Sequence, residues 1–530
     1  MGEVDMGVRR LRFSAKVAAF GAAVVAAAAL AVFSLAGCSS AGQSDGASAG
    51  GQSLTVAWTS NQGDHSLDPA NNYMGWQGSY LGVYEQLFRI DGDFNVQPML
   101  AESAETADGG LTWVLKVRDG VTFQNGKALD AEAVKDSLQH SIDGSARAKS
   151  SLGIASMRAE GQTLTVTLSA PNLYFKNELS EPVASVIDVD SGADQSTPVG
   201  TGPFKISSMD SSGNVELDGY EGYWQGTPKL SHVTALYLTD DTSKVNALQS
   251  GEVQALMNVG DDQLSLFQND PRYSVHQTNQ ARANMLYFNM NSPIMQDAKV
   301  REAVSKLVDR DSYINSIYSG AAEAAPAAFP EESGWATGVK QAGYDVDGAR
   351  ELLREAGYAD TDGDGYLDKD GRRLQVTFAT YQANASLPKI CEVMSAQLAQ
   401  VGIDAKVEVA EKIADRLNSG NWDIGTLAVN TLPTGNPLTY LSSVMGQSGN
   451  QNYGKYANPE IDALLAELKT TSDSARQHEI VTQIQNLALA DHAYVYVAHA
   501  LVNDVCASDV KSLAMQGQYD WLNWQTSVAK

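Results

Sequence analysis

Nine residues from Asp360 to Asp368 place side chains where a calcium-binding loop would have them. Carboxylates stand at the first, third, fifth and ninth positions, namely Asp360, Asp362, Asp364 and Asp368, and glycine stands at the sixth. Calcium prefers such oxygen ligands, and the glycine permits the sharp turn of the loop. The twelfth position is Gly371, where a bidentate glutamate is needed. Two interpretations stay open: a weak structural calcium site, and an acidic, glycine-rich connection to the next strand.

The chain shows no catalytic constellation. It has no nucleophile elbow, no His-Glu-x-x-His and no Cys-x-x-Cys. A secreted hydrolase stays open as a remote alternative, because the members of a catalytic triad meet only in the folded chain. His492 and His499 flank an apolar, strand-like run, where structural histidines are expected rather than ligands. We therefore predict a protein that is not an enzyme and that has no cofactor besides the calcium considered above.

The N-terminal segment, residues 1–37, has the layout of an export signal. Four basic residues precede 21 uncharged ones, Val17 to Gly37, and a cysteine follows. Leu35-Ala36-Gly37-Cys38 resembles the lipobox of bacterial lipoproteins, in which the cysteine is lipidated and becomes the new N-terminus. The resemblance implies a lipid anchor at Cys38 on the outer face of the cytoplasmic membrane. The alternative is an uncleaved transmembrane helix, since about 20 apolar residues can span a bilayer.

Charge and composition limit the kinds of partner that the exported part can bind. The chain has a formal net charge of -26, and phosphate binding needs a basic surface, so no nucleic-acid partner is expected. Residues 38–53 comprise Cys38 and a Gly/Ser/Ala-rich tract, which predicts a flexible linker. About 500 residues remain, enough for two or three lobes. Cys391 and Cys506 are expected to be buried free thiols, and the protein to be a monomer.

Periodic patterns predict a mixture of strands and capped helices. The expected strands are Leu54 to Thr59, Leu286 to Asn289, Leu374 to Thr380 and Ile403 to Val409. Asp297, Asp345 and Asn458 are expected to cap helices, the last with a proline at the first helical position. Tyr73 and Trp76 recur at helical spacing with Tyr80 and Tyr84, and they either pack in the core or line a pocket.

Several short strings occur in the order typical of one protein family. They include Leu67-Asp68-Pro69, Tyr84-Glu85-Gln86-Leu87, Pro198 to Phe204, Gly222-Tyr223-Trp224, Val245 to Val253 and Val300 to Val304. In these strings the chain resembles the family 5 solute-binding proteins of ABC importers, the peptide/nickel class, from about Leu54 to the C-terminus. The resemblance implies an α/β, two-lobed periplasmic-binding-protein fold with an extra inserted α+β subdomain.

The same resemblance implies boundaries for each part. Lobe I is expected to comprise residues 54–84, 199–278 and 500–530, because the chain crosses between lobes twice and returns. The inserted subdomain is expected at residues 85–198, and lobe II at residues 279–499. A ligand in the cleft would bridge the lobes and favour their closed arrangement. The closed form would then dock on the permease subunits of an importer whose ATPase lies in the cytoplasm.

At the positions that bind the ligand in relatives, this chain does not have the same residues. Peptide-binding relatives hold the peptide amino group with an aspartate four residues before a proline; here the proline matches Pro437 and the residue four before it is Pro433, which carries no charge. Nickel-binding relatives place a histidine twelve residues after that proline, which here is Gly449, and use two arginines for the carboxylates of a chelate. Arg147 approximately matches one of these arginines. The other would fall near Glu181 to Ser185, where no arginine occurs.

An Arg147 guanidinium suits a peptide carboxyl-terminus as well as a chelate carboxylate, by bidentate geometry, although it could also be a solvated surface arginine. We predict a short peptide held largely through main-chain hydrogen bonds. Its expected contacts are Tyr73, Trp76, Arg147, Asn436 and Tyr440. A nickel or other metal chelate is the alternative ligand, and a cell-surface adhesin would not account for the family strings.

Overall fold

The computed structural model describes residues 52–59, 65–71, 74–192, 196–382, 384–513 and 521–529. It divides the chain into Met1–Gly50 and Gly51–Lys530, and only the second unit is described below. Two residues selected from the sequence, Cys38 and Tyr73, lie outside the described ranges. Within those ranges, no helix combines the length and the apolar character that crossing a membrane requires.

The unit contains an eleven-stranded mixed sheet. Its order is β17, β16, β18, β12, β19, β11, β1, β10, β9 and β8, with β13 paired to β19. The strands are β1 Gln52–Trp58, β8 Phe204–Met209, β9 Val215–Gly219, β10 Leu230–Tyr237, β11 Ala255–Leu256, β12 Tyr273–Phe288, β13 Ala322–Ala324, β16 Gln375–Tyr381, β17 Asp404–Ala410, β18 Ile424–Asn430 and β19 Tyr494–Ala507.

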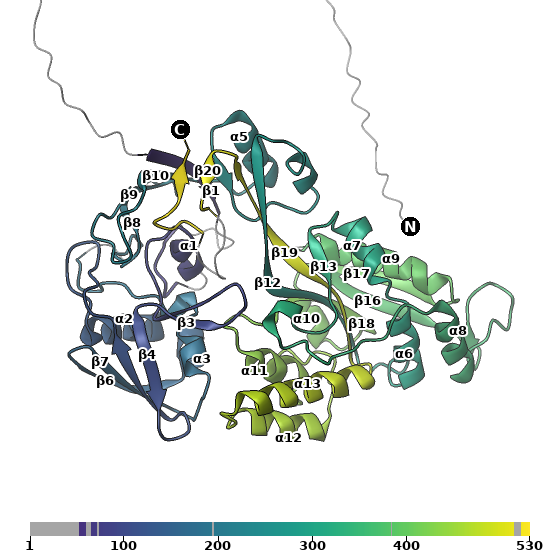
Figure 1. Cartoon of the computed structure of the whole chain (residues 1–530). Helices are drawn as coiled ribbons and strands as arrows, with labels where there is room; N and C mark the ends of the chain where they lie inside the picture. The colour runs from purple at the N-terminus through teal and green to yellow at the C-terminus, as the bar shows by residue number, and fades with distance from the viewer. Residues whose placement is uncertain are drawn as a thin grey trace, which may run out of the picture. The chain divides into compact units, whose positions relative to one another are not determined.

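Two long antiparallel strands, β12 and β19, lie side by side in the middle of this sheet (Figure 1). Their register runs from Tyr273 opposite Ala507 to Tyr287 opposite Tyr494. It is interrupted between Asn279 and Arg282, where Ala281 has a φ of 54°. Since alanine rarely adopts this left-handed conformation, the interruption is a local irregularity that the surrounding pairing must hold in place.

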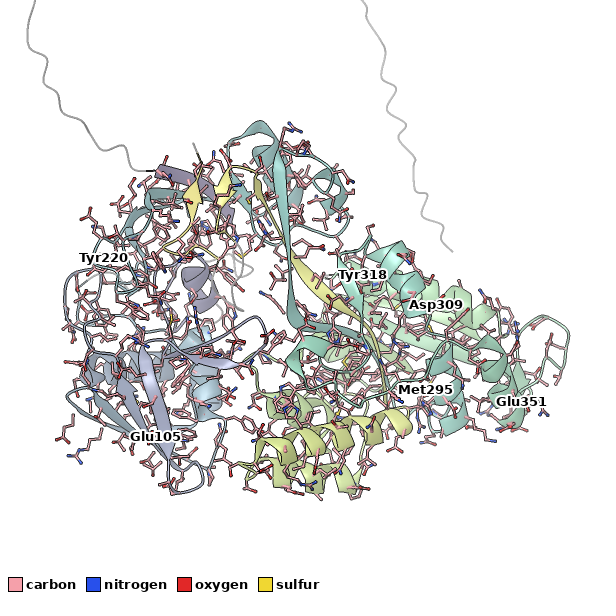
Figure 2. The ribbon with its side chains drawn as sticks, viewed as in Figure 1. Glu105, Tyr220, Met295, Asp309, Tyr318 and Glu351 are labelled. Carbon is pink, nitrogen blue, oxygen red and sulfur yellow. The ribbon has the colours of Figure 1, made fainter. Side chains whose placement is uncertain are left out.

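Helices cover both faces of the β16–β18–β12–β19 part of the sheet. One core cluster joins these strands to α12 (Pro459–Leu468) and α13 (Ser474–Ala490). The other joins them to α6 (Ala298–Lys306), α7 (Arg310–Ile317), α8 (Val346–Glu355) and α9 (Ser386–Ala399). In Figure 2, Tyr318 lies toward this core and is fully buried, whereas Glu351 of α8 points outward.

A second, four-stranded sheet lies within the predicted inserted subdomain. Its order is β4 (Ala101–Thr106), β5 (Thr112–Val117), β7 (Thr163–Leu168) and β6 (Ile154–Glu160). The alternate residues of β5 and β7 that point inward form one core with α2 (Ala131–Gly144) and α3 (Ala146–Leu152). A short hairpin of β2 (Phe88–Ile90) and β3 (Val96–Pro98) precedes this sheet.

The remaining α-helices and β-strands are short. They are α1 Met74–Tyr80, α4 Phe175–Glu178, α5 Asp241–Ser250, α10 Ile413–Asn418, α11 Pro437–Tyr440, β14 Asp368–Lys369, β15 Arg372–Arg373, β20 Val510–Lys511 and β21 Ser527–Val528. The predicted caps are confirmed: Asp297, Asp345 and Asn458 each accept a main-chain N–H in the first turn of α6, α8 and α12. The predicted domain boundaries stay predictions, and β12 continues across residues 278 and 279 without a break.

Candidate functional site

Arg147 is held between an aromatic ring and a carboxylate. Its guanidinium carbon lies 4.6 Å from the ring centroid of Trp76, in a cation–π contact. The same guanidinium forms an ion pair with Glu181. The side chain of Glu181 is 4% exposed and that of Arg147 is 34% exposed. A guanidinium carries five N–H donors and can pair with more than one carboxylate, so this residue type also suits a ligand carboxylate.

The local fold explains how these three side chains meet. Ser145 caps α3 by accepting the N–H of Ala148, which places Arg147 in the first turn of that helix. Trp76 belongs to α1, which packs against a one-turn helix at Pro182–Ala184. A Cβ at Gly75 would lie 2.6 Å from the carbonyl oxygen of Pro182, so this packing requires a glycine. Glu181 directly precedes the one-turn helix.

Glu178, one helical turn before Glu181, is a buried carboxyl group. Its Oε1 accepts a hydrogen bond from the Nδ2 of Asn436, at 3.4 Å. Burial raises the pKa of Glu178 to about 8, and the negative charge of Glu181 acts in the same direction. The hydrogen bond from Asn436 and the charge of Arg147 lower it, but by less. Glu178 therefore carries a proton over much of the neutral range in this arrangement.

The loop before α11 supplies the partners of α4. The Nδ2 of Asn177 donates to the carbonyl oxygen of Thr434 at 2.8 Å. Asn436 caps α11 by accepting the N–H of Leu438, also at 2.8 Å. Gly435 has a φ of +68°, and a Cβ there would lie 2.3 Å from the carbonyl oxygen of Phe94. Residues of the predicted inserted subdomain and of predicted lobe II are thus in direct contact.

The structure brings three of the sequence-selected ligand residues, Trp76, Arg147 and Asn436, to this region. Tyr440 lies elsewhere: it is 2% exposed, its hydroxyl is 2.8 Å from that of Tyr496, and its ring packs against Phe329 in the core of lobe II. Tyr73 lies outside the described residues. No comparison tests these ligand contacts, and they stay predictions.

Sequence reasoning missed Asn177, Glu178 and Glu181. The available signal was a pair of glutamates three residues apart between apolar Phe175 and Val183. This signal is weak, because Lys176, Asn177 and Ser180 make the segment polar and acidic residues are mostly exposed. Nothing in the segment itself could reveal Asn436, which lies 258 residues after Glu178.

Only three of the four predicted calcium ligands lie close together in the acidic loop. Carboxylate oxygens of Asp360, Asp362 and Asp364 lie within 4.8 Å of one another, and all three residues are exposed. Asp368 does not join them, because its carboxylate accepts hydrogen bonds from the main chain and hydroxyl of Thr361. Asp364 is also paired with Arg373.

The histidines and cysteines have structural surroundings. His499 is 1% exposed, and burial lowers its pKa to about 4. His492 lies 3.7 Å from Glu302, and burial also lowers its pKa. Cys391 and Cys506 are buried free thiols, as predicted, and burial raises the pKa of each to about 11.

A family model described as "Bacterial extracellular solute-binding proteins, family 5 Middle" matches residues 95–452. The chain belongs to this family. This confirms the resemblance seen in the sequence, and with it the substrate-binding function for an ABC importer.

The relatives of the chain divide between two kinds of ligand. The nickel-binding protein NikA of Staphylococcus aureus is 28% identical over 421 residues, which are 79% of this chain and 83% of NikA. The oligopeptide-binding protein AppA of Bacillus subtilis is 26% identical over 443 residues, 78% of this chain and 80% of AppA. The crystal structure of a nickel ABC transporter protein from Bacillus halodurans is 30% identical, with a TM-score of 0.81, and the match covers 90% of this chain and 100% of that one. The two-lobed α/β fold is thereby confirmed.

Proposed function

We propose that this protein captures a short peptide outside the cytoplasmic membrane and delivers it to the permease of an ABC importer. The observation that carries this proposal is Arg147, whose guanidinium contacts Trp76 and pairs with Glu181 while its side chain is 34% exposed. Beside its pairing with Glu181, such a guanidinium can accept a second carboxylate, which suits the carboxyl-terminus of a peptide. The protein is also proposed to act as a monomer. It needs no catalysis of its own, because the importer's ATPase supplies the energy.

The metal chemistry of the site supports a peptide over a metal held by protein ligands. Among the described residues, Asp360, Asp362 and Asp364 are the one group of three or more His, Cys, Asp or Glu side chains close enough to share a metal ion. A nickel chelate is the second candidate, since its carboxylate could bind Arg147 while its own donors hold the metal. The similarity to the two nickel-binding relatives favours this candidate.

Mass spectrometry and metal analysis of the protein purified from its native membranes distinguish the two ligands. Recovery of peptides, with binding of those peptides weakened at least tenfold in Arg147→Ala, supports the proposal. Arg158→Ala is the matched control, because its side chain is 81% exposed and pairs only with the equally exposed Glu160 on β6. Stoichiometric nickel with a small carboxylate or histidine chelator overturns the peptide and establishes the chelate.

A further inference from the structure

The contact between α4 and residues 434–436 joins the predicted inserted subdomain to predicted lobe II. Asn177 and Asn436 each donate across it, to Thr434 and Glu178 respectively, and all four residues are buried. Binding proteins with two lobes alternate between open and closed arrangements. A contact between two parts that move apart on opening would form on closure and would expose its polar groups to water on opening.

Glu178 is the one member of this contact that can change its charge. An ionised carboxylate removed from water is costly unless cations or several donors surround it. Here the hydrogen bond from Asn436 is long, at 3.4 Å, and the neighbouring guanidinium of Arg147 already pairs with Glu181. A protonated Glu178 avoids this cost, so the closed contact prefers the neutral acid.

Charged residues occur on the elements packed against α4, on α4 itself and in the turn that follows it. They are Arg89 on β2, Arg147 and Lys149 on α3, Lys176 on α4 itself and Glu181 in the turn that follows; the loop from Leu432 to Tyr440 carries no charged residue. Of these, Glu181 raises the pKa of Glu178 and Arg147 lowers it, and burial outweighs both. The balance favours the protonated form.

We propose that closure of the two lobes takes up a proton at Glu178, which makes the contact between α4 and residues 434–436 a pH-sensitive latch. This inference rests on the two-lobed fold and is independent of the ligand's identity. A carboxyl group exposed in the open form has its ordinary pKa of 4.5, and in the closed contact its pKa is about 8. By linkage, closure weakens as the pH rises between these values, by up to about tenfold per pH unit, and becomes independent of pH above about 8.

Hydrogen–deuterium exchange of the purified full-length protein, without added ligand, tests the latch. The measured quantity is the protection factor of amides in residues 174–181 and 432–440, corrected for the intrinsic pH dependence of exchange, from pH 5.5 to 9. We expect protection in the parent to fall at least tenfold from pH 6 to pH 8. In Glu178→Gln, whose amide cannot ionise, protection should not vary with pH. An invariant parent, or equal slopes in both proteins, overturns the proposal.

Two further variants keep the test decisive if Glu178→Gln folds poorly. Asn177→Ala removes a neutral hydrogen bond from the same contact, so it should lower protection equally at every pH and leave the slope unchanged. Asp504→Asn is the matched control, because Asp504 is a buried carboxyl group on β19 bonded to the main chain of Asn258, away from the contact. Loss of the slope in either of these variants, with retention in Glu178→Gln, contradicts the assignment to Glu178.

Discussion

The side-chain amide of Asn177 donates a 2.8 Å hydrogen bond to the main-chain carbonyl oxygen of Thr434, 257 residues further along the chain. Because the acceptor belongs to the main chain, the bond fixes the path of the loop before α11 whatever side chain stands at position 434. Two residues later the same loop caps α11 through Asn436. In this arrangement the position of the helix relative to α4 therefore depends on the side chain of Asn177 and not on the side chain at position 434.

The close approach of this loop to the β2–β3 hairpin leads to the first prediction. Gly435→Ala should weaken the contact, because its Cβ would meet the carbonyl oxygen of Phe94 at 2.3 Å. A left-handed alanine alone costs about 1–2 kcal/mol, and the displaced loop adds to this. Gly109→Ala is the control, since Gly109 has a φ of +73° with nothing within 4 Å of its added Cβ. Chemical denaturation should show a larger loss for Gly435→Ala; equal losses would contradict the close approach.

A buried carboxylate explains two of the family strings and supplies the second prediction. Glu85 accepts hydrogen bonds from the hydroxyl of Tyr223 at 2.7 Å and from the indole N–H of Trp224 at 3.0 Å. Glu85→Ala leaves both donors without this acceptor, which should lower the free energy of unfolding by about 2–4 kcal/mol. Glu160→Ala, at an 81% exposed ion pair, should leave the denaturation midpoint unchanged. A midpoint shift of the same size in both variants would refute the role of Glu85.

Local signals in the sequence predict the elements well where one face is apolar. The caps at Asp297, Asp345 and Asn458 are found as expected, since a cap depends only on residues within one turn. The strand expected at Leu286 to Asn289 is the end of β12, which begins at Tyr273. Its first half contains several polar residues and is only partly buried, so it lacks the apolar alternation that marks a strand.

The arrangement of the site could be predicted only in part. Trp76 and Arg147 were selected from the sequence, and the structure places them in contact. The pairing of Glu178 with Asn436 could not be foreseen, because it depends on how the predicted inserted subdomain packs against predicted lobe II and not on sequence spacing. Tyr440 illustrates the opposite case: an aromatic residue one turn after a helix start fits a ligand pocket or a core equally well, and here it is buried.

The acidic loop supports a third prediction. We expect no calcium-dependent rise in melting temperature, because Asp364 already pairs with Arg373 and the twelfth position of the loop is Gly371. Differential scanning fluorimetry with millimolar calcium and with magnesium as the control measures this directly. A rise specific to calcium that disappears in Asp362→Ala would establish a structural calcium site instead.

Anchoring through Cys38 is the fourth prediction. Cys38→Ser should release the protein from the membrane or leave the leader uncleaved, since lipidation requires the thiol, and labelled palmitate should enter only the parent protein. Deletion of residues 39–51 is the control, and it should preserve ligand binding in solution. If the serine variant stays in the membrane fraction with unchanged mobility, the transmembrane anchor replaces the lipid.

His499 on β19 makes the stability of the protein sensitive to acid, which is the last prediction. Its Nε2 lies 3.2 Å from the carbonyl oxygen of Ala327, and burial lowers its pKa from 6.5 to about 4. The folded state therefore binds fewer protons than the unfolded state, so the stability contributed by neutral His499 is present above pH 6.5 and is lost as the pH falls toward 4. The loss should reach about 3 kcal/mol.

His499→Gln isolates this contribution, because a glutamine amide can donate to Ala327 but does not titrate. The comparison must be a difference between variant and parent, since the raised pKa values of Glu178 and Asp504 give stability the opposite dependence on pH. Urea denaturation at pH 7.0 and pH 4.5 should show a smaller acid-induced loss in the variant than in the parent, even if the variant is less stable at both values. An equal loss in the two proteins would assign the acid sensitivity to other groups.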